Sequence, residues 1–142
     1  MSLERTLSII KPDAVEKRKI GSIIERLESE GFRICAMKRI HLTLNEARGF
    51  YAVHRERPFF DELTKFMSRS SIVVMALERE NAIQKYREVI GATDPAKAAP
   101  GTLRKLYGTD VGENALHGSD SPETAQAEVS YFFAGYEVGP LV

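Results

Sequence analysis

The chain has 142 residues, of which 43% are hydrophobic and 28% charged, a balance typical of one soluble globular domain with a single core. Lysine plus arginine and aspartate plus glutamate each total 20, so no net charge attracts the chain to nucleic acid or to a membrane surface. The N-terminus lacks a secretory signal pattern and no apolar stretch is long enough to span a membrane, so we expect a cytoplasmic protein. Any anion that it binds must be met by a local group of cations.

The first half of the chain contains the patterns of two strands and three helices. Alternating side chains over residues 5–11 predict a strand that a proline ends, so Lys11 lies at its exit. From Ile20 apolar residues recur at helical spacing until Gly31 stops the pattern, which predicts an amphipathic helix. The single cysteine, Cys35, cannot form an internal disulfide, and we interpret it as a small core residue. A strand and two short helices are predicted next, over residues 32–43, 45–53 and 58–67.

The second half begins with an unbroken apolar run over residues 72–77, which is typical of a central strand covered on both faces. Helical spacing returns over residues 81–90 and ends at a glycine. Between residues 91 and 114 prolines and glycines break every long pattern, so we expect a long loop with one short helix near residues 102–107. Loops of this length in a compact domain usually serve function. A short strand over residues 114–117 and a last helix from Ser121 to about residue 133 complete the chain.

The order of these elements predicts the fold class. A strand-helix-strand unit occurs twice, which is the βαββαβ arrangement of an α+β domain. We therefore expect a ferredoxin-like, antiparallel four-stranded sheet with the helices packed on one face. No linker, repeat or low-complexity segment divides the chain, so residues 1–142 are interpreted as a single domain.

The segment with the clearest chemistry is Asn-Ala-Leu-His-Gly-Ser-Asp at residues 114–120. It places His117 beside Gly118, directly before the start of a helix. A glycine lets a bulky anion approach the backbone, and a helix N-terminus offers unpaired N–H groups and partial positive charge. This surrounding suits a phosphate group at the imidazole, although a histidine beside a glycine is, taken alone, more often a surface-loop residue.

A nucleophilic imidazole needs one neutral ring nitrogen, with a partner that holds the other nitrogen. Glu128 is the candidate partner, because it shares a face of the last helix with the apolar residues Ala125 and Phe132. A carboxylate on that inward face needs a partner of its own. The sequence therefore predicts that Glu128 orients His117.

From about residue 4 to residue 137 the chain resembles the nucleoside diphosphate kinase family. The segment at residues 114–120 matches the family's signature around its phosphorylated histidine. Four further segments support the resemblance: Glu-Arg-Thr-Leu-Ser-Ile-Ile-Lys-Pro-Asp at 4–13, Phe-Tyr-Ala-Val-His-Arg-Glu-Arg-Pro-Phe-Phe at 50–60, Gly-Ala-Thr-Asp-Pro at 91–95 and Pro-Gly-Thr-Leu-Arg at 100–104. The family's fold is the same doubled strand-helix-strand domain.

The resemblance implies the residues that bind a nucleoside di- or triphosphate. Lys11 and Asn114 would hold the sugar hydroxyls, and Phe59 would stack on the base with Val111 packing opposite. Guanidinium groups suit phosphate oxygens. The phosphate-binding residues implied are Arg57, Arg87, Thr93 and Arg104.

The resemblance also implies the reaction. The γ-phosphate of a nucleoside triphosphate, mainly ATP, would pass through a phosphohistidine at His117 to a nucleoside diphosphate in ping-pong order. Glu128 would orient His117, Ser119 would bond to Glu128, and Tyr51 would lie beside the histidine, with Lys11 as a further catalytic residue. Base stacking reads no base edges, so we expect broad base specificity.

Mg²⁺ is the expected cofactor, bridging phosphate oxygens, and we expect it to arrive with the nucleotide because no carboxylate cluster suggests a protein cage. By resemblance the chain forms a homo-oligomer, a tetramer or hexamer built from dimers, and its short C-terminus is more like that of bacterial members. No membrane and no specific nucleic acid is expected as a partner. There is also no P-loop or Rossmann fingerprint.

Two other classes of function remain open alternatives. A nucleic-acid-binding or regulatory module with this fold would use exposed aromatic residues on its strands, and the strands over residues 5–11 and 72–77 contain none. A scaffold with a dead site would not need the complete set of matched residues.

The chain departs from the family pattern at two places. Arg69-Ser70-Ser71 stands where the family usually has Ser-Gly-Pro, and Arg79 stands where it usually has glycine. Both differences bear on the turns at the ends of the central strand and on subunit packing.

His54 is interpreted as a residue at the edge of the site, not a second nucleophile.

Overall fold

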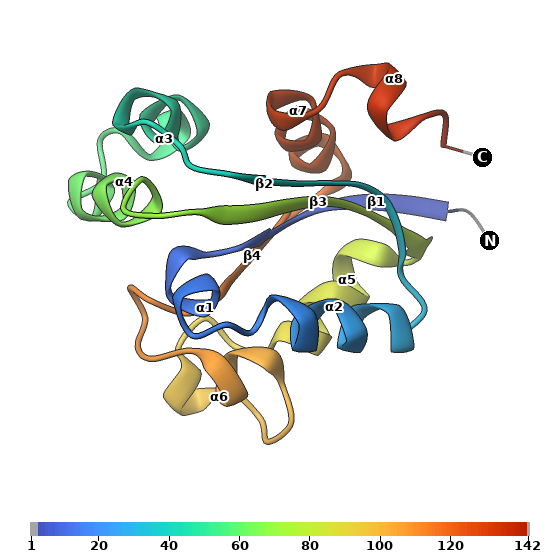
Figure 1. Ribbon diagram of the computed structural model, residues 1–142, viewed down its shortest axis with the longest axis horizontal. Coiled ribbons are helices and arrows are strands. Elements are labelled where there is room, and N and C mark those ends of the chain that lie inside the picture. Colours follow the sequence, from blue (N-terminus) through green and yellow to red (C-terminus); the bar gives the residue numbers. More distant parts are fainter. Residues whose placement is uncertain (1–2, 142) are drawn as a thin grey trace.

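Four strands form one antiparallel sheet in the computed structural model, which describes residues 3–141 (Figure 1). The strands are β1 (Leu3–Ile10), β2 (Arg33–Ile40), β3 (Ile72–Glu80) and β4 (Leu116–Gly118). They lie in the order β2-β3-β1-β4, and every neighbouring pair is antiparallel. The ferredoxin-like α+β fold predicted from the sequence is confirmed.

Helices cover both faces of this sheet, so the prediction that they pack on one face is wrong (Figure 1). Below the sheet in Figure 1 lie α1 (Pro12–Glu16), α2 (Ile20–Ser29), α5 (Ala82–Ile90) and α6 (Leu103–Tyr107). Above it lie α3 (Leu44–Phe50), α4 (Phe60–Met67), α7 (Pro122–Phe132) and α8 (Gly135–Val138). Two 3-10 turns, η1 (Ala52–His54) and η2 (Pro95–Lys97), lie in the connections.

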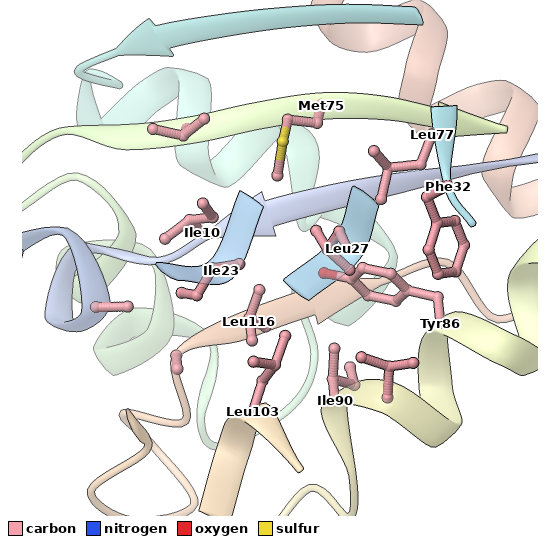
Figure 2. Packing of buried hydrophobic residues seen from close by; sticks show 14 of the residues in the cluster. Ile10, Ile23, Leu27, Phe32, Met75, Leu77, Tyr86, Ile90, Leu103 and Leu116 are labelled. Carbon is pink, nitrogen blue, oxygen red and sulfur yellow. The ribbon is translucent and has the colours of Figure 1, made fainter. Parts of the chain in front are cut away.

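The sequence of β3 explains the two covered faces. Successive side chains of a strand point to opposite faces, and residues 72–77 are all buried apolar residues. Met75 and Leu77 join Ile23 and Tyr86 in the core between the sheet and the helices α2 and α5 (Figure 2). Ile72, Val74 and Ala76 belong to the second core, together with Leu7, Ile9 and Val129. A run without alternation therefore has an apolar layer on each side, as predicted for residues 72–77.

Some element boundaries differ from the predictions. The short helices α1 and α8 were not predicted, and β3 continues to Glu80 because it stays paired with β1 as far as Leu3. The pairing of β2 with β3 is irregular between Ile34 and Ala36. Cys35 lies at this irregularity, where it is half-buried against the second core, and burial raises the pKa of its thiol. No helix among residues 3–141 combines the length and hydropathy needed to cross a bilayer.

Both departures from the family pattern make contacts at the ends of β3. The Arg69 guanidinium lies 2.6 Å from a carboxylate oxygen of Glu16 and 3.3 Å from one of Glu113. At the other end, Arg79 donates to the carbonyl of Glu30 and lies over the ring of Phe32 at 5.4 Å. Each arginine thus ties an end of β3 to a neighbouring segment.

Candidate active site

The backbone of His117 is fixed by its strand and by a buried tyrosine. His117 pairs with Ile9 across β4 and β1, and its carbonyl accepts a hydrogen bond of 3.0 Å from the Tyr86 hydroxyl. The same ring lies against Gly118, where an added Cβ would meet Tyr86 carbons at 2.6 Å. Glycine is therefore required at this position by a close approach within the fold, in addition to any space that an anion needs.

A hydrogen-bonded chain connects the His117 imidazole to the sheet. Its Nε2 lies 3.0 Å from Oε1 of Glu128 on α7, the pairing that the sequence predicted. The Ser119 hydroxyl donates to the same oxygen at 2.7 Å and accepts the backbone N–H of Leu7 at 3.1 Å. Ser119 is buried, so this chain holds Glu128 against β1.

The charge of Glu128 decides the state of the ring. Burial raises the pKa of the Glu128 carboxyl, but the hydrogen bond and charge of His117 and the Ser119 hydroxyl outweigh it, and the pKa lies below its ordinary value. At neutral pH the carboxylate is ionised and can only accept a hydrogen bond. In the neutral imidazole Nε2 therefore carries the hydrogen, and Nδ1 keeps its lone pair.

Two aromatic rings from the end of α3 form a wall beside the imidazole. The centroid of Phe50 lies 5.5 Å and that of Tyr51 lies 6.3 Å from the His117 ring, both in edge-to-face contact. The hydroxyl of Tyr51 is buried and has no hydrogen-bond partner among the described residues. Burial and the nearby Glu128 carboxylate raise its pKa, so it stays neutral. Tyr51 lies beside the histidine as expected, and Phe50 was not anticipated.

Lys11, Asn114 and Thr93 come together from three distant parts of the chain. The Lys11 ammonium donates to Oδ1 of Asn114 at 2.8 Å, and the Asn114 amide donates to the Thr93 carbonyl at 3.0 Å. Burial and the charge of Arg104 lower the pKa of Lys11 to about 8, with Asp13 opposing them. Lys11 is thus a buried cation with a single side-chain partner among the described residues, poised for a further acceptor.

A cleft of about 410 Å³ brings Arg87, Thr93 and Arg104 together. Arg104 donates to the carbonyls of Gly91 at 3.0 Å and Leu116 at 2.7 Å, which places its guanidinium next to the backbone that carries His117. Burial lowers the pKa of Arg104, Tyr86 opposes this, and the charge of Arg87 adds to it. The cleft therefore gathers positive charge at one side of the histidine.

Arg57, Phe59 and Val111 do not line this cleft. Arg57 is exposed in the segment after η1, and the Phe59 and Val111 side chains are exposed at 47% and 58%. The His54 ring packs 5.6 Å from Phe59, which agrees with its interpretation as a residue at the edge of the site. Of the predicted nucleotide-binding residues, the structure thus places five close together and three outside the cleft. The five are Lys11, Arg87, Thr93, Arg104 and Asn114, and the three are Arg57, Phe59 and Val111.

The start of α7 differs from the expected anion site. The Ser121 hydroxyl accepts the N–H of Thr124 at 3.2 Å, and the Thr124 hydroxyl accepts the N–H groups of Asp120 and Ser121 at 3.2 and 3.0 Å. Three of the N–H groups around the helix start are therefore satisfied by the cap itself. Positive charge for an anion comes from the side chains of the cleft.

Two acidic residues of the site were not anticipated. Asp120 forms an ion pair of 2.6 Å with Arg87. Asp13 is buried, and its Oδ2 accepts the backbone N–H of Ala115 at 3.0 Å. A signal for both was present, since Asp13 ends one segment of the family resemblance and Asp120 ends another.

Comparisons with known proteins point to one family. The family model described as nucleoside diphosphate kinase matches residues 4–138. A nucleoside diphosphate kinase of Sorangium cellulosum is 74% identical over 140 residues, which are 99% of this chain and 97% of that protein. One from Geobacter sulfurreducens is 60% identical over 136 residues, 96% of this chain and 99% of that protein.

Two solved structures are also similar. The Aquifex aeolicus nucleoside diphosphate kinase superposes with a TM-score of 0.95 at 50% identity, covering 97% of this chain and 100% of that one. A halophilic nucleoside diphosphate kinase from Halobacterium salinarum, in complex with CDP, has a TM-score of 0.92 at 37% identity, covering 98% and 93%.

Proposed function

The chain belongs to the nucleoside diphosphate kinase family and is a phosphotransferase, and from this premise we propose that His117 carries the phosphate. It takes the γ-phosphate of a nucleoside triphosphate, mainly ATP, and passes it to a nucleoside diphosphate. The observation that carries the proposal is the bond of 3.0 Å between Glu128 and Nε2 of His117, beside a cleft lined by two arginines.

The nucleophile is Nδ1 of His117. In the first half-reaction the Nδ1 lone pair forms an N–P bond, and the bond between the γ-phosphorus and its bridging oxygen breaks, so ADP leaves with that electron pair. The ring becomes cationic, and the Glu128 carboxylate on the Nε2 hydrogen stabilises this charge. In the second half-reaction the terminal oxygen of a nucleoside diphosphate attacks the same phosphorus and Nδ1 is released.

The phosphates are held by cations on one side of the imidazole. Arg104 has donors beside the His117 backbone, and Arg87 is now paired with the exposed carboxylate of Asp120, which a phosphate can replace. Thr93 lines the same cleft. We assign Arg57 to the phosphates by its match to the family, because it lies on an exposed segment outside the cleft.

The sugar and base are bound with little reading of base identity. Lys11 and Asn114 form the polar pair for the sugar hydroxyls, with Tyr51 beside the histidine. Phe59 offers an exposed ring face, and Val111 an exposed apolar side chain, for a base. The Halobacterium relative binds CDP, a pyrimidine nucleotide. Stacking uses a face that every base possesses, so purines and pyrimidines are both substrates.

Mg²⁺ is the cofactor of the proposed reaction and enters bound to the nucleotide. Among residues 3–141 no group of three His, Cys, Asp or Glu side chains is placed to hold a metal ion. The cleft is lined by the cationic side chains of Arg87 and Arg104. Mg²⁺ prefers oxygen ligands, so the phosphate oxygens of the nucleotide are the ligands that fit it. When bound, the ion would lower the charge of the phosphates.

The remaining parts of the proposal concern surroundings and partners. We infer a cytoplasmic homo-oligomer, a tetramer or hexamer built from dimers, from the family match. Specific nucleic acid is not a partner in this account, because helices cover both faces of the sheet on which aromatic readers of RNA would lie.

Initial rates measured over a range of ATP concentrations, at several fixed concentrations of GDP, test the proposed order. Parallel double-reciprocal lines are expected, because the first product leaves before the second substrate enters. The H117A variant should have no detectable transfer. His41 is an exposed histidine that bonds to the Ser68 carbonyl, so H41A is a matched control and should keep the wild-type rate. Intersecting lines, or transfer by H117A, would rule out the phosphohistidine route.

A further inference from the structure

The backbone two residues before His117 is strained. Ala115 has φ +73°, and the N–H of Leu116 donates to the carbonyl of Asn114 at 2.8 Å. A bond between residues i and i+2 around a positive φ is a γ-turn of the strained kind, and side chains rarely adopt it. Two other residues with side chains have positive φ among residues 3–141, Arg18 and Asn81, and both are exposed. Ala115 is fully buried.

Both polar groups of this strained residue are bound at the junction of β1 and α1. The Ala115 N–H donates to Oδ2 of Asp13 at 3.0 Å, and its carbonyl accepts the N–H of Lys11 at 2.8 Å. The Lys11 side chain in turn donates to Asn114. The turn is thus held from one side by three hydrogen bonds from two residues of a distant segment, Lys11 and Asp13.

The burial of Asp13 is unfavourable for the stability of the fold. It is only 3% exposed, and its second oxygen, Oδ1, has no hydrogen-bond partner among the described residues. Burial raises the pKa of its carboxyl, while the N–H groups of Ala14 and Ala115 and the Lys11 ammonium oppose this. A buried carboxylate with an unpaired oxygen costs desolvation energy. We therefore look for a contribution of Asp13 to the adjoining active site, and not to stability.

We propose that Asp13 is a positioning residue of the phosphotransfer site: by holding the N–H of Ala115 it keeps the strained turn closed and so fixes Asn114 relative to His117. This inference rests on the proposed function of His117. Asp13 itself contacts no reacting atom. It acts through a turn that connects the sugar-binding amide to the strand of the nucleophile.

A double-mutant cycle separates this role from a merely structural one. D13A should lower the rate of His117 phosphorylation by Mg-ATP about tenfold, the loss expected for one hydrogen bond to a charged group, and should weaken ADP binding. Glycine adopts a positive φ without strain. In the A115G background the turn needs less support, so the same D13A change should cost less than about threefold.

Two further variants are matched controls. D13N keeps an oxygen that can accept the Ala115 N–H, so it should restore the rate to within about threefold of wild type. Glu4 makes the same kind of bond elsewhere, with Oε1 accepting the N–H of Ile83 at 2.9 Å. E4A should therefore lower the melting temperature and leave the phosphorylation rate per folded molecule unchanged.

The inference is overturned if D13A costs the same in both backgrounds, or if D13A lowers stability as E4A does while its rate stays at the wild-type value. Hydrogen exchange at the Ala115 amide gives a readout that does not depend on activity. Compared with wild type, exchange of this amide should be only slightly faster in D13N but much faster in D13A. Unchanged exchange in D13A would also overturn it. Should D13A fail to fold, D13N is measured in the wild-type and A115G backgrounds. A rate loss that is smaller in the A115G background supports the inference, and an equal loss in both overturns it. A wild-type protein that is never phosphorylated would instead refute the proposed function, and the exchange result would still stand.

Discussion

Replacing Glu128 with alanine tests the orientation of the nucleophile. The change removes the carboxylate that lies 3.0 Å from Nε2 of His117. Ser119 keeps its bond to the N–H of Leu7, so the sheet itself is little disturbed. What is lost is the partner that selects the tautomer of the ring and stabilises its positive charge once Nδ1 is phosphorylated.

The size of the loss follows from the kind of bond. A hydrogen bond to a charged group contributes about 1.5–3 kcal/mol. Each 1.36 kcal/mol on a barrier changes a rate tenfold, so E128A should phosphorylate about 10- to 150-fold more slowly than wild type. E128Q keeps an oxygen that can accept the Nε2 hydrogen but carries no charge, and it should fall between the two.

The assay is a rapid quench of the reaction with Mg-ATP into alkali, followed by the mass of the protein, which gives the phosphorylated fraction against time. Urea denaturation of each unreacted variant shows that it is folded. If E128A is phosphorylated within about twofold of the wild-type rate, a bond of this class is not contributing to the reaction and the assigned role of Glu128 is wrong.

The affinity for ADP, measured by calorimetry, should fall as the pH rises through about 8, where Lys11 loses its proton, and K11R should remove this dependence because arginine stays charged. R69A should lower the free energy of urea unfolding by no more than about 1 kcal/mol, since its ion pairs are exposed; a larger loss would contradict this. G118A should lower that free energy by about 1–3 kcal/mol through a clash with Tyr86. G21A, which meets nothing within 4 Å in α2, should not.

The fold was largely predictable because its signals are local. The unbroken apolar run over residues 72–77 and the helical spacing from Ile20 each reflect burial of one element, and the doubled strand-helix-strand order then leaves few topologies. The second layer of helices was missed although the apolar run over residues 72–77 already predicted a strand covered on both faces, because the helical patterns of α3 and α4 do not show which face of the sheet they pack on. The short helix α1 has only five residues, too few for a periodic pattern.

The contacts of the site were predictable where they join residues close in the sequence, and not where they join distant segments. The pairing of Glu128 with His117 could be predicted because His117 lies shortly before α7 and Glu128 lies on that helix, only 11 residues further along the chain. The bond from Ala115 to Asp13 spans 102 residues and exists only because β4 pairs with β1. Phe50 gave no signal beyond its place at the start of the matched segment 50–60, since its contact with the imidazole depends on how α3 crosses the sheet. The exposure of Arg57, Phe59 and Val111 likewise reflects loop positions that no local pattern fixes.

The central claim is that His117 itself carries the phosphate, and the intact mass of the protein tests it most directly. After brief exposure to Mg-ATP at neutral or alkaline pH the protein should gain one acid-labile phosphate, and addition of GDP should remove it and yield GTP. H117A should gain none. A wild-type protein that stays unmodified throughout while GDP is still converted to GTP would contradict the account.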